Sequence, residues 1–397
     1  MLKVLSLLNK ERAMRFTHVH FMPYTGVTKK SYDWPVANKQ FDGKIGTALW
    51  KEYIEDKVYA EECGFDYISS NEHHYSPYGM MPNPNLVGAI VSDRTSSAKI
   101  VQTGNLIPIL NPIRVAEEYA MLDVASGGRL VAGFMRGIPH EYVAYNVSAD
   151  ESYERMEEGV ELILKCWTEP EPFGWEGKYY QFRAVSVWPK PIQRPHPPIL
   201  MSVQSERSTK IAARFKAIAG ILALTSFDEA RETMDRYRMF ARQEGWEPTN
   251  EHFTSGSTCC IAPTYEEAKS HLEPAMEYFF GTLGGGIRTA QKIVVQKTRF
   301  WGSKEEAKTF ASRAVNMRQG GLSFDERVDR GLIICGTPEM AIKQIERFHK
   351  ELGIVNMSLN VNVGNMPREV GRRTMEYLRD IVFPAVKHLG VTYQAAE

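Results

Sequence analysis

The feature that most constrains the fold is a repeated alternation of short apolar runs with longer segments of helical spacing. Residues 15–22 (RFTHVHFM) are rich in β-forming residues and predict a first strand. Residues 42–64 follow with apolar residues at helical spacing, and a glycine ends them. The same cycle predicts further strands at 65–70, 99–104, 129–134, 199–203, 217–224, 253–262 and 354–361.

Eight strand–helix units are typical of a closed (β/α)8 barrel. The strands are continuous apolar runs, which suits a parallel sheet covered by helices. An open doubly wound sheet is the alternative. We therefore predict an α/β fold with one (β/α)8 barrel over residues 14–397, preceded by a short extension at 1–13. Insertions are expected near 169–197, where 180–198 form an irregular proline-dense arm, and near 281–331, which lacks a clean strand pattern.

The composition excludes some classes of protein. Lys and Arg total 48, and so do Asp and Glu, which gives a formal net charge of zero. A protein that follows nucleic-acid phosphates needs clustered excess Lys and Arg, so this balance argues against that class. No run approaches the roughly 18 to 20 apolar residues that cross a bilayer. The five cysteines are scattered without a CxxC pair, which is typical of reduced thiols and makes the cytoplasm the expected location.

The stretch 69–75 (SSNEHHY) leaves the second expected strand with a carboxylate and two imidazoles. A metal site is one interpretation, but adjacent residues leaving a strand point in opposite directions, and no other His or Asp cluster has ligand spacing. A polar barrel rim with hydrogen-bonded histidines is a second. The third is proton transfer by His73, with Glu72 orienting the imidazole and His74 in a structural role.

Two other strand ends carry polar groups that suit an anion. Arg136 leaves the fourth expected strand, where a guanidinium can clamp an anion through two nitrogens. Gln204, Ser205 and Ser208 lie where the next strand turns into a helix, and Ser205 is well placed as its N-cap. Taken alone, Arg136 could form a salt bridge at the rim and Ser205 could be a simple N-cap. The occurrence of the arginine and the serines on the same rim suggests a bound phosphate. No GxGxxG, GxxxxGK[ST] or GxSxG motif is present, which argues against a two-domain NAD enzyme.

From residue 14 onward the sequence resembles the bacterial luciferase-like flavin-dependent monooxygenases. The matching segments are AEECGFDYISSNEHHY (60–75), NPIRVAEEYAMLDVASGGRLVAGFMRG (111–137), WPKPIQRPHPPI (188–199) and CGTPEMAIKQI (335–345). The resemblance implies a (β/α)8 barrel that binds reduced FMN non-covalently at the carboxyl ends of the strands, usually as a homodimer.

The resemblance also implies roles for individual residues. His73 matches the family's active-site histidine, which is associated with the oxygenated flavin. Arg136, Ser205 and Ser208 match its phosphate-binding residues, and Met135 falls where a side chain abuts the flavin ring. Residues 103–105 (TGN) match a strand end with an unusual peptide bond under the ring, although Asn105 replaces a small residue often found there.

The substrate side is expected to be aromatic. The candidates are Phe21, Tyr24, Tyr75 and Tyr78. Such a strip can belong to the core, but Tyr75 and Tyr78 lie in a proline-bounded loop at a strand end, which favours a pocket.

These observations predict an FMN-dependent monooxygenase of the two-component type. A separate flavin reductase supplies reduced FMN, and dioxygen and a small organic compound are the substrates. His73 is expected to donate or accept a proton. The alternatives are a deazaflavin-dependent hydride transferase of the same superfamily, a non-catalytic flavin-binding protein and a metal hydrolase.

Overall fold

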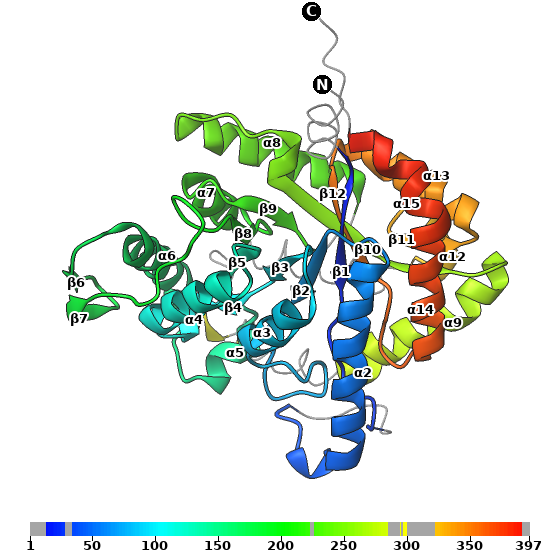
Figure 1. Ribbon diagram of the computed structural model, residues 1–397, viewed down its shortest axis with the longest axis horizontal. Coiled ribbons are helices and arrows are strands. Elements are labelled where there is room, and N and C mark those ends of the chain that lie inside the picture. The colour runs from blue at the N-terminus through cyan, green and yellow to red at the C-terminus, as the bar shows by residue number, and fades with distance from the viewer. Residues whose placement is uncertain are drawn as a thin grey trace, which may run out of the picture.

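The protein is a closed parallel barrel with helices around it (Figure 1). The computed structural model describes residues 13–27, 34–222, 226–284, 294, 297–299 and 322–390. Within them, eight strands pair side by side in the order β12, β1, β2, β3, β5, β8, β9 and β10, and β10 also pairs with β12 to close the ring. The predicted (β/α)8 barrel is therefore confirmed, and the open sheet is excluded.

The barrel strands match the predicted runs. Their bounds are β1 (Arg15–Val19), β2 (Tyr67–Ser70), β3 (Lys99–Gln102), β5 (Leu130–Met135), β8 (Ile199–Ser202), β9 (Ile218–Ile221), β10 (Phe253–Ile261) and β12 (Asn356–Asn360). A two-residue strand, β4 (Asn105–Leu106), adds to β5. All these pairings are parallel, so the carboxyl ends of the strands open onto one face of the barrel.

The helices begin where the sequence supplies capping side chains. Asp42, Asn83, Asn111, Ser205 and Thr337 each accept backbone N–H groups at the start of a helix, as N-cap residues do. The helices are α2 (Gly43–Glu62), α3 (Pro84–Arg94), α4 (Pro112–Ala125), α5 (Pro139–Ala144), α6 (Ser152–Thr168), α7 (Glu206–Arg214), α8 (Phe227–Gln243), α9 (Tyr265–Glu277), α12 (Phe324–Asp329), α13 (Pro338–Leu352), α14 (Arg368–Tyr377) and α15 (Phe383–Val386).

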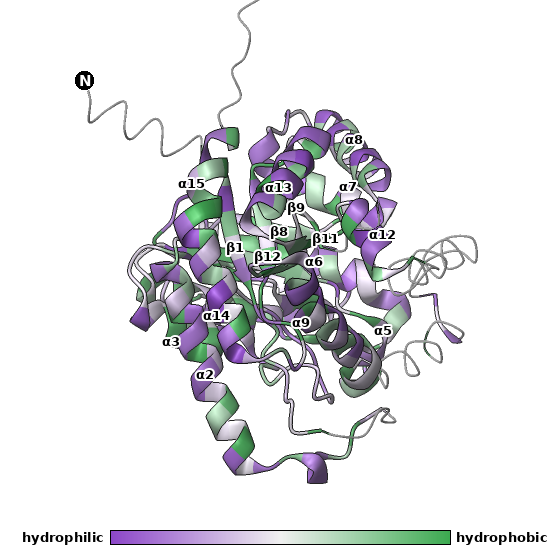
Figure 2. Ribbon diagram, turned by 90° about the vertical axis from the view of Figure 1, so that its right-hand side faces the viewer, coloured by the Kyte–Doolittle hydropathy of each residue, from purple (hydrophilic) through white to green (hydrophobic). Residues whose placement is uncertain are grey.

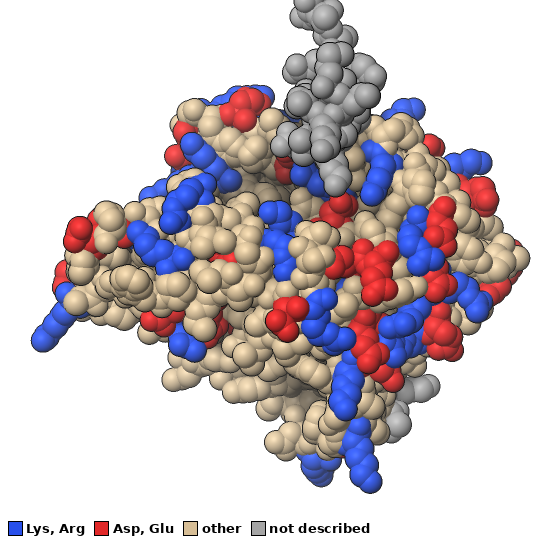
Figure 3. Space-filling view, viewed as in Figure 1, with Lys and Arg blue, Asp and Glu red and all other residues tan. Residues whose placement is uncertain are grey.

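Apolar side chains fill the space between strands and helices. Buried residues from both ends of the chain meet there, as in the stacked rings of Phe16 and Phe383, whose centroids are 4.3 Å apart. Figure 2 shows apolar residues along the strands and a mixture of apolar and polar residues along the outer helices. On the face seen in Figure 3, positive and negative side chains are interspersed. No helix in the described ranges is long and apolar enough to cross a membrane.

Three strands lie where the sequence analysis predicted none. Within the insertion predicted near 169–197, β6 (Phe173–Glu176) and β7 (Gln181–Val185) form an antiparallel hairpin that projects from the barrel (Figure 1). Its cross-strand pair of Trp175 and Phe182 gives the hairpin an apolar side that a proline count does not reveal. The other strand, β11 (Ile333–Gly336), pairs with the end of β10.

The predicted division of the chain stays a prediction. The extension at 1–13 lies almost entirely outside the described residues, and so does most of the insertion at 281–331. The described part of that insertion contains α12, which leads directly into β11.

Candidate active site at the carboxyl ends of the strands

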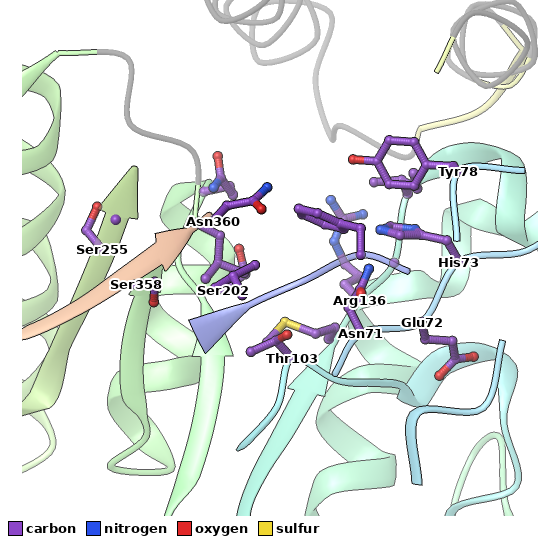
Figure 4. Close-up of a pocket in the computed structure, with 18 of the residues that line it drawn as sticks. Asn71, Glu72, His73, Tyr78, Thr103, Arg136, Ser202, Ser255, Ser358 and Asn360 are labelled. Atoms are coloured by element: carbon purple, nitrogen blue, oxygen red, sulfur yellow. The ribbon is translucent and has the colours of Figure 1, made fainter. Parts of the chain in front are cut away.

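A cavity of about 580 Å³ opens at the carboxyl ends of the barrel strands. Its wall includes residues at or just beyond the ends of β1, β2, β3, β5, β8 and β12, and residues 255–258 within β10 (Figure 4). The structure brings eight of the predicted site residues together around it: Phe21, His73, Tyr78, Met135, Arg136, Gln204, Ser205 and Ser208. Asn105 and Tyr75, which were also predicted, do not line it.

His73 is held against the cavity by a carboxylate that the sequence analysis missed. Its Nδ1 lies 3.0 Å from Oε1 of Glu141, which is on α5. The His73 side chain is 21% exposed, whereas that of Glu141 is fully buried. Burial alone raises the pKa of Glu141, but the hydrogen bond and charge of His73, helped by the Ile138 N–H, outweigh burial and leave this pKa below its usual value. Glu141 therefore favours the anionic form.

Glu72 points away from His73 and pairs with His74 instead (Figure 4). Its Oε1 lies 2.8 Å from Nε2 of His74, and its Oε2 accepts the Leu106 N–H at 3.1 Å. Burial raises the pKa of Glu72 despite these partners. The prediction that Glu72 orients His73 is wrong, because successive residues leaving a strand face opposite ways and place Glu72 with His74.

An anion cradle lies at the start of α7. Ser205 caps this helix as predicted, since its Oγ accepts the Ser208 N–H at 3.1 Å. The Tyr153 hydroxyl is 2.8 Å from Ser205 Oγ, and the Arg136 guanidinium lies over the Tyr153 ring, 4.1 Å from its centroid. Arg136 Nη1 also donates to Ser152 Oγ at 3.1 Å. The cradle thus combines a helix N-terminus, two serine hydroxyls and a guanidinium, which is the donor set that binds phosphate groups.

Tyr153 is a site residue that the sequence analysis missed. It begins the helix predicted at 153–168, and its ring lies between the guanidinium groups of Arg136 and Arg207. Nothing in its local sequence distinguishes it from a core tyrosine. Only the contacts between α6, α7 and the end of β5 reveal its place in the wall.

The floor near Met135 has an unusual backbone. The peptide bond between Thr103 and Gly104 is cis, which agrees with the unusual bond implied by the resemblance. A Cβ on Gly104 would lie 2.4 Å from the Gly133 carbonyl oxygen, so only glycine allows the backbone at position 104 to approach β5 so closely. Thr103 lines the cavity, whereas Asn105 continues into β4 and is buried outside the lining.

An aromatic wall lies next to His73. It consists of Phe21, Tyr78 and Phe279, with ring centroids 4.5–5.6 Å apart, and the Tyr78 ring meets the His73 ring edge-on at 5.0 Å. Tyr75 is instead 54% exposed and donates its hydroxyl to the Ala144 carbonyl at 3.2 Å. Tyr24 lies in neither place, because it is buried in the core. The predicted aromatic strip is therefore divided among the cavity, the outer surface and the core.

Comparison with known proteins identifies a family. The family model described as luciferase-like monooxygenase matches residues 36–355. The alkanal monooxygenase alpha chain of Aliivibrio fischeri is 23% identical over 77% of this chain and 85% of its own length. The oxygenase component of the flavin-dependent trigonelline monooxygenase of Acinetobacter baylyi is 29% identical, over 49% of this chain and 54% of its own length. An uncharacterised protein of Sinorhizobium fredii, y4wF, is 31% identical, and this chain spans about half of its length (50%).

Solved structures with the same fold include two monooxygenases. RslO1 from Streptomyces bottropensis is 27% identical with a TM-score of 0.71, over 94% of this chain and 99% of that one. The oxygenating constituent of 3,6-diketocamphane monooxygenase from Pseudomonas putida, in complex with FMN, is 18% identical with a TM-score of 0.72, over 94% and 98%. An F420-dependent secondary alcohol dehydrogenase is also 18% identical, with a TM-score of 0.66 over 94% and 99%.

Proposed function

Since the chain belongs to the luciferase-like monooxygenase family, we propose that it is the oxygenase component of a two-component system that binds reduced FMN. In this proposal a separate flavin reductase supplies the cofactor, and the enzyme oxygenates a small organic substrate with dioxygen. The observation that carries the proposal is the anion cradle of Arg136, Ser205 and Ser208, which opens into the same cavity as His73. A relative that is itself named an oxygenase component supports the two-component part.

The residues of the cavity fit a flavin mononucleotide. The cradle offers backbone and side-chain donors to a terminal phosphate, while Thr103 and Met135 line the same cavity, where a flat ring system can lie against them. Gln204 lines the cavity next to the cradle. When bound in its reduced form, the flavin supplies the electrons that activate dioxygen.

His73 is the residue proposed to move a proton. Its Nδ1 is committed to Glu141, so Nε2 is the ring nitrogen that can exchange a proton with a molecule in the cavity. The Glu141 carboxylate fixes the orientation of the ring and stabilises it when it is positively charged, as buried carboxylates do behind catalytic histidines. Tyr78 and Phe279 keep the space next to His73 apolar and limit the access of water.

A hydride transferase that uses the deazaflavin F420 is the second candidate. The F420-dependent alcohol dehydrogenase of the same fold motivates it. F420 also carries phosphate, so the cradle alone does not separate the two cofactors.

Anaerobic titration with FMN, riboflavin and F420 tests the proposal. We expect FMN to bind at least about tenfold more tightly than riboflavin, because only FMN has a phosphate for the cradle, and Arg136→Met to remove most of that difference. Tighter binding of F420 than of FMN, with F420-dependent hydride transfer, would overturn the cofactor assignment. Rapid turnover with NADH and FMN but without a reductase would contradict the two-component part.

A homodimer is proposed to form through α3 and α4. These adjacent helices expose four apolar side chains, at Leu86, Ile90, Met121 and Val124. Apolar residues gathered on one face of a soluble protein favour association. Sedimentation of the wild type and of the Leu86→Glu, Met121→Glu variant tests this, and a wild-type monomer would refute it. The cytoplasmic location stays a prediction.

A further inference from the structure

The charged residues that line the cavity are not all balanced by partners. They are Glu72, His73, Arg136, Glu141 and Arg327. The first four take part in the two histidine–carboxylate pairs or in the anion cradle. For the Arg327 guanidinium, the described part of the chain contains neither an ion pair nor a hydrogen bond. Among the described residues, one positive charge of the wall is therefore left unmatched.

Arg327 lies away from the anion cradle. It is a half-buried residue on α12, and its carbonyl accepts the Leu332 N–H at 2.9 Å. The Leu332 carbonyl in turn accepts the Ser257 hydroxyl at 2.8 Å, which ties the end of α12 to β10. Around the barrel, β8 and β9 separate β10 from β5, the strand that leads into Arg136. The two arginines therefore belong to different sides of the cavity mouth.

The surroundings of Arg327 combine an apolar wall with a few hydroxyl groups. Leu332 and Ile333 line the cavity beside it, as do Ser257 and Thr258 within β10, where Thr258 pairs with Ile333. The aromatic wall of Phe21, Tyr78 and Phe279 lines the same cavity and meets His73. A substrate that lies against the aromatic wall could thus present one end to His73 and the other to Arg327.

We propose that Arg327 is a specificity residue that binds an oxyanion, a carboxylate or a sulfonate, on a substrate with an apolar or aromatic body. This inference rests on the proposed function, because it assigns the cradle at Arg136 to the cofactor and leaves Arg327 to the substrate. A guanidinium stays charged and presents several N–H donors in a plane, which matches both kinds of oxyanion. A neutral substrate of the same shape leaves that charge unpaired in a wall from which water is partly excluded, and therefore binds less tightly.

Matched probes test the proposal without the natural substrate. Calorimetric titrations compare benzoate with benzamide and benzenesulfonate with benzenesulfonamide, on the FMN-loaded protein and on the protein without FMN. We expect each anion to bind at least about tenfold more tightly than its neutral partner, and Arg327→Met to abolish that preference. Arg327→Lys should keep part of it, because it keeps the charge but loses the planar donors.

Arg330→Met is the matched control, because Arg330 is exposed at the end of the same helix and does not line the cavity. It should keep the full preference for anions, and FMN affinity should stay unchanged in all three variants. Equal binding of anions and neutral probes to the wild type, no binding of the anions, or a preference that survives Arg327→Met in the FMN-loaded protein would each overturn the proposal, since FMN then occupies the cradle at Arg136. A failure of FMN to bind the wild type contradicts the proposed function instead, while the preference is still measured without FMN.

Discussion

Two histidine–carboxylate pairs lie side by side in this protein and differ in almost every other respect. His73 faces the cavity and pairs with Glu141, whereas His74 is buried and pairs with Glu72. The pKa of Glu141 is held below its usual value by His73 against the effect of burial, and the pKa of Glu72 is raised by burial. The same two residue types therefore form one pair that keeps a charge beside the cavity and one that is predicted to serve the fold.

The difference follows from the geometry of a strand end. Alternation sends Glu72 and His74 to one side and His73 to the other. The hydrogen-bond partner of His73 comes instead from α5, 68 residues further along the chain. A catalytic role for one imidazole and a structural role for the other are the consequence to test.

Replacing His73 gives the largest expected effect. His73→Ala should lower the rate of substrate oxygenation by about 10²-fold or more, since general acid–base groups contribute roughly that much. FMN affinity should stay close to that of the wild type, because the cradle is separate from His73. The initial rate of product formation, measured with saturating reduced FMN, reports the loss. An oxygenation rate within threefold of the wild type would remove His73 from the mechanism.

Alternation and strand order made much of this site predictable. The eight apolar runs gave the barrel, and once the strands are parallel their polar ends must share one face, which brought His73, Arg136 and Ser205 together. Ser205 was recognisable as a cap because serine before a helix has a local function.

Residues whose role depends on distant contacts were not predictable. Glu141 and Tyr153 lie in ordinary helical sequence, and only packing brings them to His73 and Ser205. Tyr75 looked like a pocket residue from its loop, but a local turn with φ of 56° directs it outward. Strand β11 follows a segment without a strand pattern, so the position of Arg327 could not be inferred from the sequence.

Removing the charge of Glu141 should have the next largest effect. Glu141→Gln keeps the shape but loses the negative charge that stabilises the imidazolium, so kcat/KM should fall by about tenfold or more. Glu141→Asp should restore part of the activity, because it returns the negative charge to the pair. A kcat/KM of Glu141→Gln within about threefold of the wild type would mean that Glu141 only supports the fold.

Replacing the histidine of the second pair should lower the stability of the protein without changing its activity. His74→Ala leaves the buried Glu72 without its closest partner, which costs about 1–3 kcal/mol in the free energy of unfolding. Urea titration measures this loss, and kcat/KM should stay within about threefold of the wild type. A loss of activity comparable with that of His73→Ala at full stability would show that the two histidines share the catalytic role.

The smallest expected effect is a difference in sign between the two carboxylates in the pH dependence of stability. The folded protein holds the Glu72 proton more tightly than the unfolded chain does, so Glu72 makes stability fall as pH rises from its ordinary pKa of 4.5 through the raised value. Glu141 does the opposite: the stability that it contributes is present above pH 4.5 and is lost as pH falls through its lowered pKa.

Urea unfolding from pH 3.5 to 8 tests this difference. Glu72→Gln should remove a decline in stability toward high pH, and Glu141→Gln should remove a decline in stability toward low pH. Slopes of the same sign in both variants would mean that the two pairs are electrostatically alike, and that orientation alone separates the histidine at the cavity from its neighbour.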